Sequence, residues 1–289
     1  MKRREFYINL VITIILWGSA FVGIRYTMGN ITPGSMALLR FTIASITILP
    51  FFILSKNKVF PKKDIKLFLL SGFLGFFLYN IALNMGEEIV TAGVASFLIS
   101  SLTIFTGIFS AIFLKERLGI FGWIGIILSF IGIGIISLSE DDILSINYGA
   151  ILVIIAAVSS SLYMILQKNL IKKYGSLNSL VWSIWSGTLF MLIYLPNLID
   201  EIKVVKSSTI AAIVYLGIFP ASLAYFTWNR ALELSDSATK TSTALYFTPL
   251  TVIVMEWLIL NEYPKSSSLL GGFFVLLGVY ISTKGKKDG

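Results

Sequence analysis

The chain has 289 residues, of which 56% are hydrophobic and only 13% charged, and its mean hydropathy is +0.86. This composition excludes an ordinary soluble domain and predicts a polytopic membrane protein. The net charge of +8 does not indicate nucleic-acid binding, because the basic residues lie in short linkers between apolar segments. The absence of Cys and His excludes disulfides, thiolate metal sites and histidine-based catalysis, so we expect neither a metal nor a cofactor.

Apolar segments of membrane-spanning length follow one another along the whole chain, and together they predict an all-α protein of ten transmembrane helices. The first segment has no small-residue cleavage site, so we expect it to remain as a span. No soluble domain is left over. The segments cover residues 6–26, 33–54, 66–86, 91–114, 119–138, 148–167, 177–196, 209–231, 238–260 and 267–284.

The second half of the chain repeats the first at an offset of 146 residues, the separation between Gly125 and Gly271. The same offset brings Gly132 onto Gly278 and segment 113–118 onto segment 259–264. In both copies an apolar run ends at a Glu and is followed by a second, glycine-spaced apolar run. The repeat predicts two units, residues 1–140 and 141–289.

The distribution of Lys and Arg predicts the orientation of the spans. With the N-terminus inside, all but five of the 23 basic residues fall on the cytoplasmic side, so we expect both termini to be cytoplasmic. Each half then crosses the membrane five times, and the second unit must be inverted relative to the first. The five exceptions are Arg25, Arg40, Lys203, Lys206 and Lys265.

Several short motifs resemble the EamA branch of the drug/metabolite transporter superfamily, over nearly the whole chain. They are Trp17–Phe21, Arg25, Pro33 and Leu39–Phe41 in the first half, and Pro249, Glu262, Gly271 and Gly278 in the second. The resemblance implies two tandem five-helix units and a transporter, most plausibly an exporter, but not its substrate. Thr103 stands where the first repeat often has the Pro matched by Pro249, so we expect a straighter fourth helix than ninth.

Two polar and aromatic triads are the best candidate site. Phe76, Tyr79 and Asn80 in the third span match Tyr225, Trp228 and Asn229 in the eighth at an offset of 149 residues, which implies a three-residue gap relative to the later alignment. Asn84 extends the first triad by one turn. The i, i+3, i+4 spacing places each triad on one helix face. Inversion would put the first triad toward the outer mouth and the second toward the inner. They are either gate and substrate contacts or an interfacial aromatic belt with interhelical Asn hydrogen bonds.

Further residues could line the same cavity. Ser96 and Ser100 belong to a small-residue face on the fourth span, which is either a plain packing seam or part of the cavity wall. Trp17, Tyr163 and Tyr246 are aromatic candidates in three other spans. Taken together, these rings favour a planar or amphipathic organic solute, including one whose ammonium group is held by cation–π attraction.

Two charged residues are candidates for coupling or charge pairing. Glu256 is the only Glu clearly inside a predicted span, so it either carries a proton or is held by a structural partner. Arg40 could bind a solute carboxylate or pair with Glu87 or Glu88, and the resemblance favours a structural Arg.

Four residues are predicted to shape helix ends and bends. Glu116 and Glu262 precede the fifth and tenth helices and are read as N-terminal caps. Pro220 and Pro249 interrupt the eighth and ninth helices, where freed carbonyls can face a cavity.

The leading interpretation is a carrier of the cell membrane that moves a small organic metabolite or amino acid by alternating access. Its partners would be the solute and the lipid bilayer, with homo-oligomerisation open and nucleic acid excluded. One alternative is a non-transporting membrane scaffold or sensor, which no signalling domain supports. A membrane enzyme is less favoured, because the chain has no His and no pair of intramembrane Asp residues.

Overall fold

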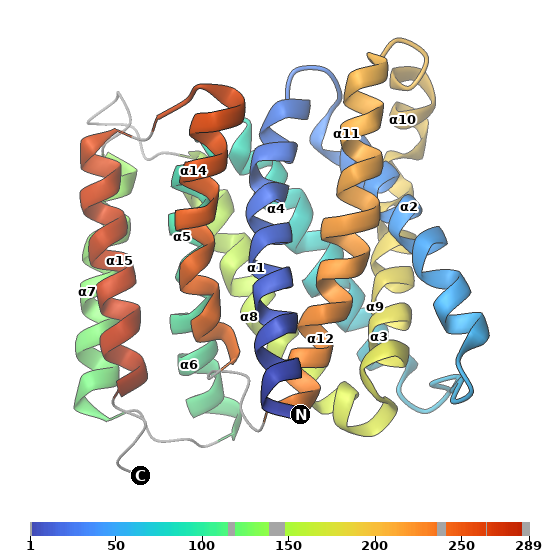
Figure 1. Cartoon of the computed structure of the whole chain (residues 1–289), viewed down its shortest axis with the longest axis horizontal. Coiled ribbons are helices and arrows are strands. Elements are labelled where there is room, and N and C mark those ends of the chain that lie inside the picture. Colours follow the sequence, from blue (N-terminus) through green and yellow to red (C-terminus); the bar gives the residue numbers. More distant parts are fainter. Residues whose placement is uncertain (1, 115–118, 139–147, 236–240, 264, 285–289) are drawn as a thin grey trace.

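A computed structural model describes residues 2–114, 119–138, 148–235, 241–263 and 265–284. Within these ranges every regular element is a helix and no strand occurs. The helices stand side by side with short connections at both ends (Figure 1). Among the described residues, seven helical runs are long and apolar enough to cross a membrane, and three shorter apolar helices accompany them.

The first half contributes five helical runs. They are α1 (Lys2–Thr27); α2 (Pro33–Leu54); α3 (Ile65–Gly72), η1 (Phe73–Leu78) and α4 (Tyr79–Glu87) as one run; α5 (Ala92–Ser100) with α6 (Leu102–Leu114); and α7 (Ile120–Leu138).

The second half follows a similar plan. Its helices are α8 (Tyr148–Tyr174); α9 (Ser176–Met191), η2 (Leu192–Tyr194) and α10 (Leu195–Glu201); α11 (Ser207–Ile218), η3 (Phe219–Leu223) and α12 (Ala224–Leu234); η4 (Thr243–Phe247) with α14 (Thr248–Leu260); and α15 (Ser266–Lys284). The single residue Gly175 joins α8 to α9, and its φ of 78° provides the left-handed conformation that a tight reversal needs.

Two of the runs contain a π-helical turn in their middle. η1 begins at Phe73 and η3 at Phe219, so the two turns are separated by the repeat offset. Pro220 lies inside η3, where its missing N–H accounts for part of the irregular hydrogen bonding. A π-turn widens the helix and is frequent at functional sites, which makes both turns relevant to the site described below.

The fourth helix, expected to be straighter than the ninth, is itself interrupted at Ser101. α5 ends at Ser100 and α6 begins at Leu102. Between them, Ser101 donates both its hydroxyl (2.6 Å) and its N–H (3.1 Å) to the carbonyl of Leu98. A serine side chain that competes for a main-chain acceptor can break a helix without proline. The ninth run is also divided, because η4 gives way to α14, which has Pro249 in its first turn.

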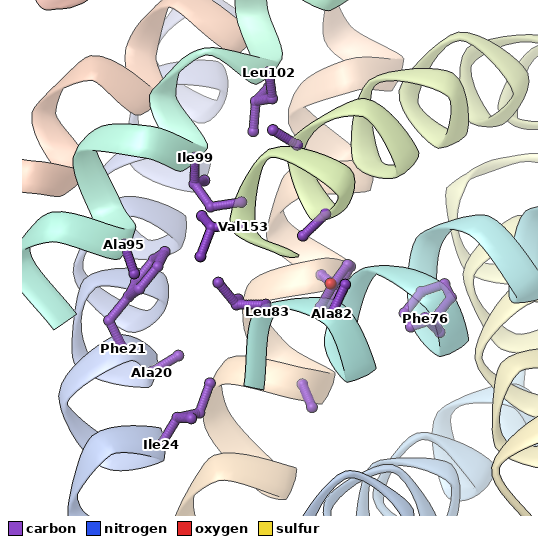
Figure 2. Packing of buried hydrophobic residues seen from close by; sticks show 14 of the residues in the cluster. Ala20, Phe21, Ile24, Phe76, Ala82, Leu83, Ala95, Ile99, Leu102 and Val153 are labelled. Atoms are coloured by element: carbon purple, nitrogen blue, oxygen red, sulfur yellow. The ribbon is translucent and has the colours of Figure 1, made fainter. Parts of the chain in front are cut away.

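The helices of the two halves pack against each other in matched pairs. α4 packs on α8, and the corresponding pair, α12 and α1, packs in the same way. α6 also packs on α8, and the corresponding α14 packs on α1. α2 contacts α9, α5 contacts α14, and α7 contacts α15. Side chains from α1, α4, α5 and α8 converge between these helices to form part of the core (Figure 2).

The most extensive helix contact in the described structure joins α7 and α15, and we call it the glycine seam. A Cβ added to Gly132 would lie 2.5 Å from the carbonyl oxygen of Gly271, and one added to Gly278 would lie 2.5 Å from that of Gly125. Ser129 Oγ donates to the carbonyl of Val275 at 3.0 Å. The register is antiparallel, because higher numbers on α7 meet lower numbers on α15. Glycines let the two backbones approach this closely.

Candidate functional site

A small cavity lies at the centre of the molecule between helices of both halves. Its wall includes Trp17, Arg40, Tyr79, Ser100 and Tyr163, together with Asn80, Ser96, Tyr225 and Thr248. The space open to water within it is about 40 Å³, which is enough for a few water molecules but far less than a metabolite occupies. The cavity as it stands is too narrow for a metabolite, and we call this arrangement of its walls closed.

Four aromatic side chains form a row beside this cavity. Ring centroids are 5.1 Å apart between Trp17 and Tyr225, 4.8 Å between Tyr225 and Phe76, and 5.4 Å between Phe76 and Tyr163. Gly75 makes room for this row, because a Cβ there would lie 2.2 Å from the ring of Tyr163. The π-turn η1 carries Gly75 and Phe76, so the irregular turn brings the row together.

The expectation that the two triads lie at opposite mouths is wrong at their first members. Phe76 of η1 and Tyr225 of α12 are in ring contact, with centroids 4.8 Å apart. From this contact the triads diverge toward opposite ends. Tyr79, Asn80 and Tyr225 line the cavity, whereas Phe76, Trp228 and Asn229 lie outside its wall. Trp228 is fully buried against Trp17, with their rings 5.3 Å apart.

The three predicted asparagines have different environments. Asn80 donates to the carbonyl of Phe76 at 2.8 Å and accepts a bond from Arg40 Nη1 at 3.5 Å. Asn84 donates to the carbonyl of Pro33 at 3.3 Å. Asn229 donates to the carbonyl of Ser176, the first residue of α9, at 3.4 Å. Asn84 and Asn229 thus cross-link helices, and Asn80 faces the cavity.

Both serines of the small-residue face line the cavity, but their hydroxyls are already bonded within their own helix. Ser96 Oγ donates to the carbonyl of Gly93 at 2.6 Å, and Ser100 Oγ donates to that of Ser96 at 2.9 Å. Their lone pairs remain open to a donor in the cavity. Tyr246 belongs to η4, and its side chain lies outside the described part of the structure.

Arg40 is the one charged side chain in the described wall of the cavity. It is 3% exposed, its Nε has no hydrogen-bond partner, and its guanidinium stands 5.3 Å from the ring of Phe41. Of the two predicted partners, Glu87 lies within electrostatic range, but the described residues show no Arg40 ion pair with Glu87 or Glu88 within 4.0 Å. Arg40 thus presents a positive charge to the cavity.

Glu256 is fully buried and bonded to the start of another helix. Its Oε2 accepts the N–H of Gly93 at 3.0 Å, in the first turn of α5. A carboxylate at a helix N-terminus is stabilised by free N–H groups and the helix dipole. Glu256 therefore joins α14 to α5, although its Oε1 has no partner.

The sequence interpretation missed Glu87 as a buried acid. This side chain is fully buried and neither carboxylate oxygen has a partner in the described structure. Its position at the end of an apolar segment suggested a surface residue. Its spacing of seven residues from Asn80, on the same helix face, was the signal that could have located it.

The predicted caps and bends are distributed as follows. Glu262 accepts a bond from Arg25 Nε at 3.4 Å, and in the described structure it accepts none from Ser266, where α15 begins. Glu116 lies outside the described residues. Pro220 lies in η3 and Pro249 where η4 meets α14, both beside helices that border the cavity.

The model of the EamA-like transporter family matches residues 6–138 and 147–284. The chain belongs to this family. It is 37% identical to the uncharacterized transporter YdfC of Bacillus subtilis, over 96% of the chain and 90% of the relative. It is 29% identical to a protein of Streptantibioticus cattleyicolor named a probable terminal-alkyne amino-acid exporter, over 97% and 94% of the two. A solved protein structure shares the fold, with a TM-score of 0.69 at 16% identity and 97% coverage of both chains.

This EamA-like protein is therefore a multi-pass membrane protein with a general role in transport. The family and the names of its relatives point to a transporter rather than an enzyme. The wall of the central cavity carries aromatic faces, the hydroxyls of Ser96, Ser100, Ser160 and Thr248, the Asn80 amide and the Arg40 guanidinium.

Proposed function

We propose that this chain is a secondary transporter that moves a small organic metabolite or amino acid out of the cell by alternating access through the central cavity. In this proposal ten transmembrane helices form two inverted repeats, residues 1–140 and 141–289, with both termini in the cytoplasm. The observation that carries the proposal is a closed polar and aromatic cavity whose wall is built by both halves.

The glycine seam supports the inverted repeat. The repeat offset converts the contact between Gly132 and Gly271 into the contact between Gly278 and Gly125. It also relates Ser129 to Val275, so these two partners are copies of the same position. Because α7 and α15 are antiparallel, a two-fold axis relating them is perpendicular to both helices. Such an axis lies in the membrane plane, as in inverted-repeat transporters.

The matched helix pairs extend the same relation across the molecule. Pairs such as α4–α8 and α12–α1 exchange under the offset, whereas α2–α9 and α7–α15 each map onto themselves. The excess of Lys and Arg on one side of the predicted spans supports cytoplasmic termini.

The cavity chemistry favours a solute with a carboxylate and an apolar or aromatic body. Arg40 provides a guanidinium that can form paired hydrogen bonds with a carboxylate, and Asn80 stands next to it. Trp17, Tyr163 and Tyr225 supply apolar faces. An amino acid fits this combination, and the similarity to a probable amino-acid exporter adds support.

Alternating access accounts for the small size of the cavity. A space of about 40 Å³ cannot hold an amino acid, so binding requires the walls to separate. The π-turns η1 and η3 lie beside the aromatic row. Their irregular hydrogen bonding makes them positions where the two helices can bend.

Efflux from proteoliposomes tests the proposal. Vesicles containing the purified protein are loaded with radiolabelled amino acids one at a time, and loss of label is compared with that from protein-free vesicles. L-phenylalanine and phenethylamine form a useful pair, because they differ only in the carboxylate. We expect efflux of the amino acid to exceed that of the amine.

Arg40→Gln and Arg230→Gln form the matched variants. Arg230 pairs with Glu5 and Glu233 outside the cavity, whereas Arg40 lines it. A hydrogen bond to a charged group is worth about 1.5–3 kcal/mol, so Arg40→Gln should weaken solute binding about 10- to 100-fold. Arg230→Gln should leave binding unchanged. If vesicles that contain folded protein lose every tested amino acid no faster than protein-free vesicles do, the scaffold or sensor alternative is favoured.

A further inference from the structure

Glu87 is a buried acid that the transport cavity described above does not use. It ends α4, its side chain is fully buried, and both carboxylate oxygens lack partners in the described structure. An ionised carboxylate without a partner is strongly disfavoured in a buried site. Something must neutralise Glu87 in this conformation.

The groups around Glu87 do not supply a counter-charge at contact distance. Arg25 of α1 donates its Nη1 to the main-chain carbonyl of Glu87 at 2.9 Å and pairs through Nε with Glu262. Arg40 of α2 bonds with Asn80. Glu256 of α14 and Tyr79 of α4 also lie within electrostatic range. From α8, Gly149 and Val153 pack against the same turn at Gly86, and neither can be ionised.

A column of polar side chains connects Glu87 with the cavity. Asn80, Asn84 and Glu87 follow one another at i, i+4 and i+7, on one face of α4. Asn80 lines the cavity, and the Oδ1 of buried Asn84 has no partner. The column continues from the cavity toward the end of the molecule opposite the N-terminus (Figure 1).

A proton fits this site better than a metal cation does. Among the described residues, no group of three or more acidic side chains is arranged to hold a metal ion. A proton neutralises a single carboxylate without further ligands.

We propose that Glu87 is a proton-binding site and that the bound proton holds the carrier in the closed conformation described here. Loss of the proton leaves a buried negative charge that must reach water, Arg25 or Arg40. In this proposal α4 shifts against α1 or α2 as the charge moves toward them, and this movement opens the adjoining end of the cavity. Proton binding at Glu87 does not depend on the proposed transport function. Only the role of the cavity as a path for the solute rests on that function.

Thiol labelling of the cavity measures this opening. The chain contains no Cys, so Ser100→Cys places a single thiol in the cavity wall without background. The labelling rate by a water-soluble maleimide is measured in lipid nanodiscs at about pH 5 and pH 9, which bracket carboxyl titration in buried sites. The same thiol in a Glu87→Gln background corrects for the pH dependence of the thiol itself.

The ratio compared is the labelling rate of Ser100→Cys alone divided by its labelling rate in the Glu87→Gln background. We expect this ratio to change at least about fivefold between the two pH values, which is the lower end of typical coupling between sites. Glu87→Gln, which resembles the protonated acid, should label slowly throughout. Glu88→Gln, at the exposed neighbouring residue, should behave as the unmodified chain does. A labelling ratio independent of pH would overturn the proposal.

Infrared difference spectroscopy of the Cys-free chain provides a second measurement that needs no transport. Lowering the pH should produce the carbonyl band of a protonated, buried carboxyl group. The band should persist in Glu256→Gln and vanish in Glu87→Gln. Its absence from the unmodified chain, or its loss only in Glu256→Gln, would refute the proton site even if efflux is observed.

Discussion

Replacing Gly132 by alanine puts a methyl group into the glycine seam. The new Cβ would lie 2.5 Å from the carbonyl oxygen of Gly271 and 2.6 Å from the nitrogen of Val275. Real Cβ atoms essentially never approach other heavy atoms within 3.0 Å, so the two backbones must separate. Overpacking of this kind costs about 1–3 kcal/mol. The higher helix propensity of alanine returns at most about 1 kcal/mol.

Gly134→Ala is the control, because it lies on the same helix and a Cβ there meets nothing within 4 Å. Thermal unfolding of purified protein in detergent should show Gly132→Ala melting a few degrees below the unmodified chain. Gly134→Ala should melt at the same temperature or slightly above. Equal melting temperatures for the two variants would refute the close approach of α7 and α15.

The repeat relation adds a second requirement. Gly278→Ala would place its Cβ 2.5 Å from the carbonyl oxygen of Gly125, so its effect should be similar to that of Gly132→Ala. Once one methyl group has separated the helices, the second should cost less. The double variant is therefore expected to lose less stability than the sum of the single variants, as contacting sites commonly do. Additive losses would contradict a shared seam.

Three other predictions concern separate parts of the molecule. Asp64 accepts bonds from Lys173 and from the hydroxyl of Tyr174, and the Lys173 bond lowers the pKa of the Asp64 carboxyl. The ionised Asp64 carboxyl stabilises the folded protein fully above its unfolded pKa, and this stabilisation is lost as the pH falls through its lower folded pKa. The melting temperature of Asp64→Asn should therefore fall less than that of the unmodified chain between about pH 7 and pH 3. Trp228→Ala should cost about 3–5 kcal/mol, and the same change at half-exposed Trp257 much less, as measured by denaturant unfolding. Ser100→Leu should fill the cavity and remove stabilisation by amino acids in a thermal-shift assay, while the ligand-free protein still unfolds cooperatively.

Hydropathy located the helical runs well. The predicted segment 33–54 coincides with α2, and segment 66–86 differs by one residue at each end from Ile65–Glu87. Apolar length is set by the bilayer and is visible in a single sequence. The interior irregularities were not visible: η1 contains no proline, and Ser101 breaks the fourth run by a side-chain hydrogen bond.

The candidate site was predicted in part. Helical spacing placed the aromatic and Asn side chains of each triad on one helix face, but it could not show which of them meet across helices or line the cavity. The contact between Phe76 and Tyr225 depends on how the third and eighth runs cross. Glu87 was misread for a similar reason, because its burial comes from packing by α1, α2 and α8 rather than from its own segment.

The glycine seam also limits which parts of the protein can move separately. Sliding α7 along α15 would drive backbone against backbone, since neither helix has side chains at Gly132 or Gly271 to deform. The two helices must therefore travel as one body, although they come from opposite halves of the chain. Their contacts with the rest of the described structure are fewer, mainly through α5. The boundary between mobile parts thus cannot follow the boundary between the two halves of the sequence.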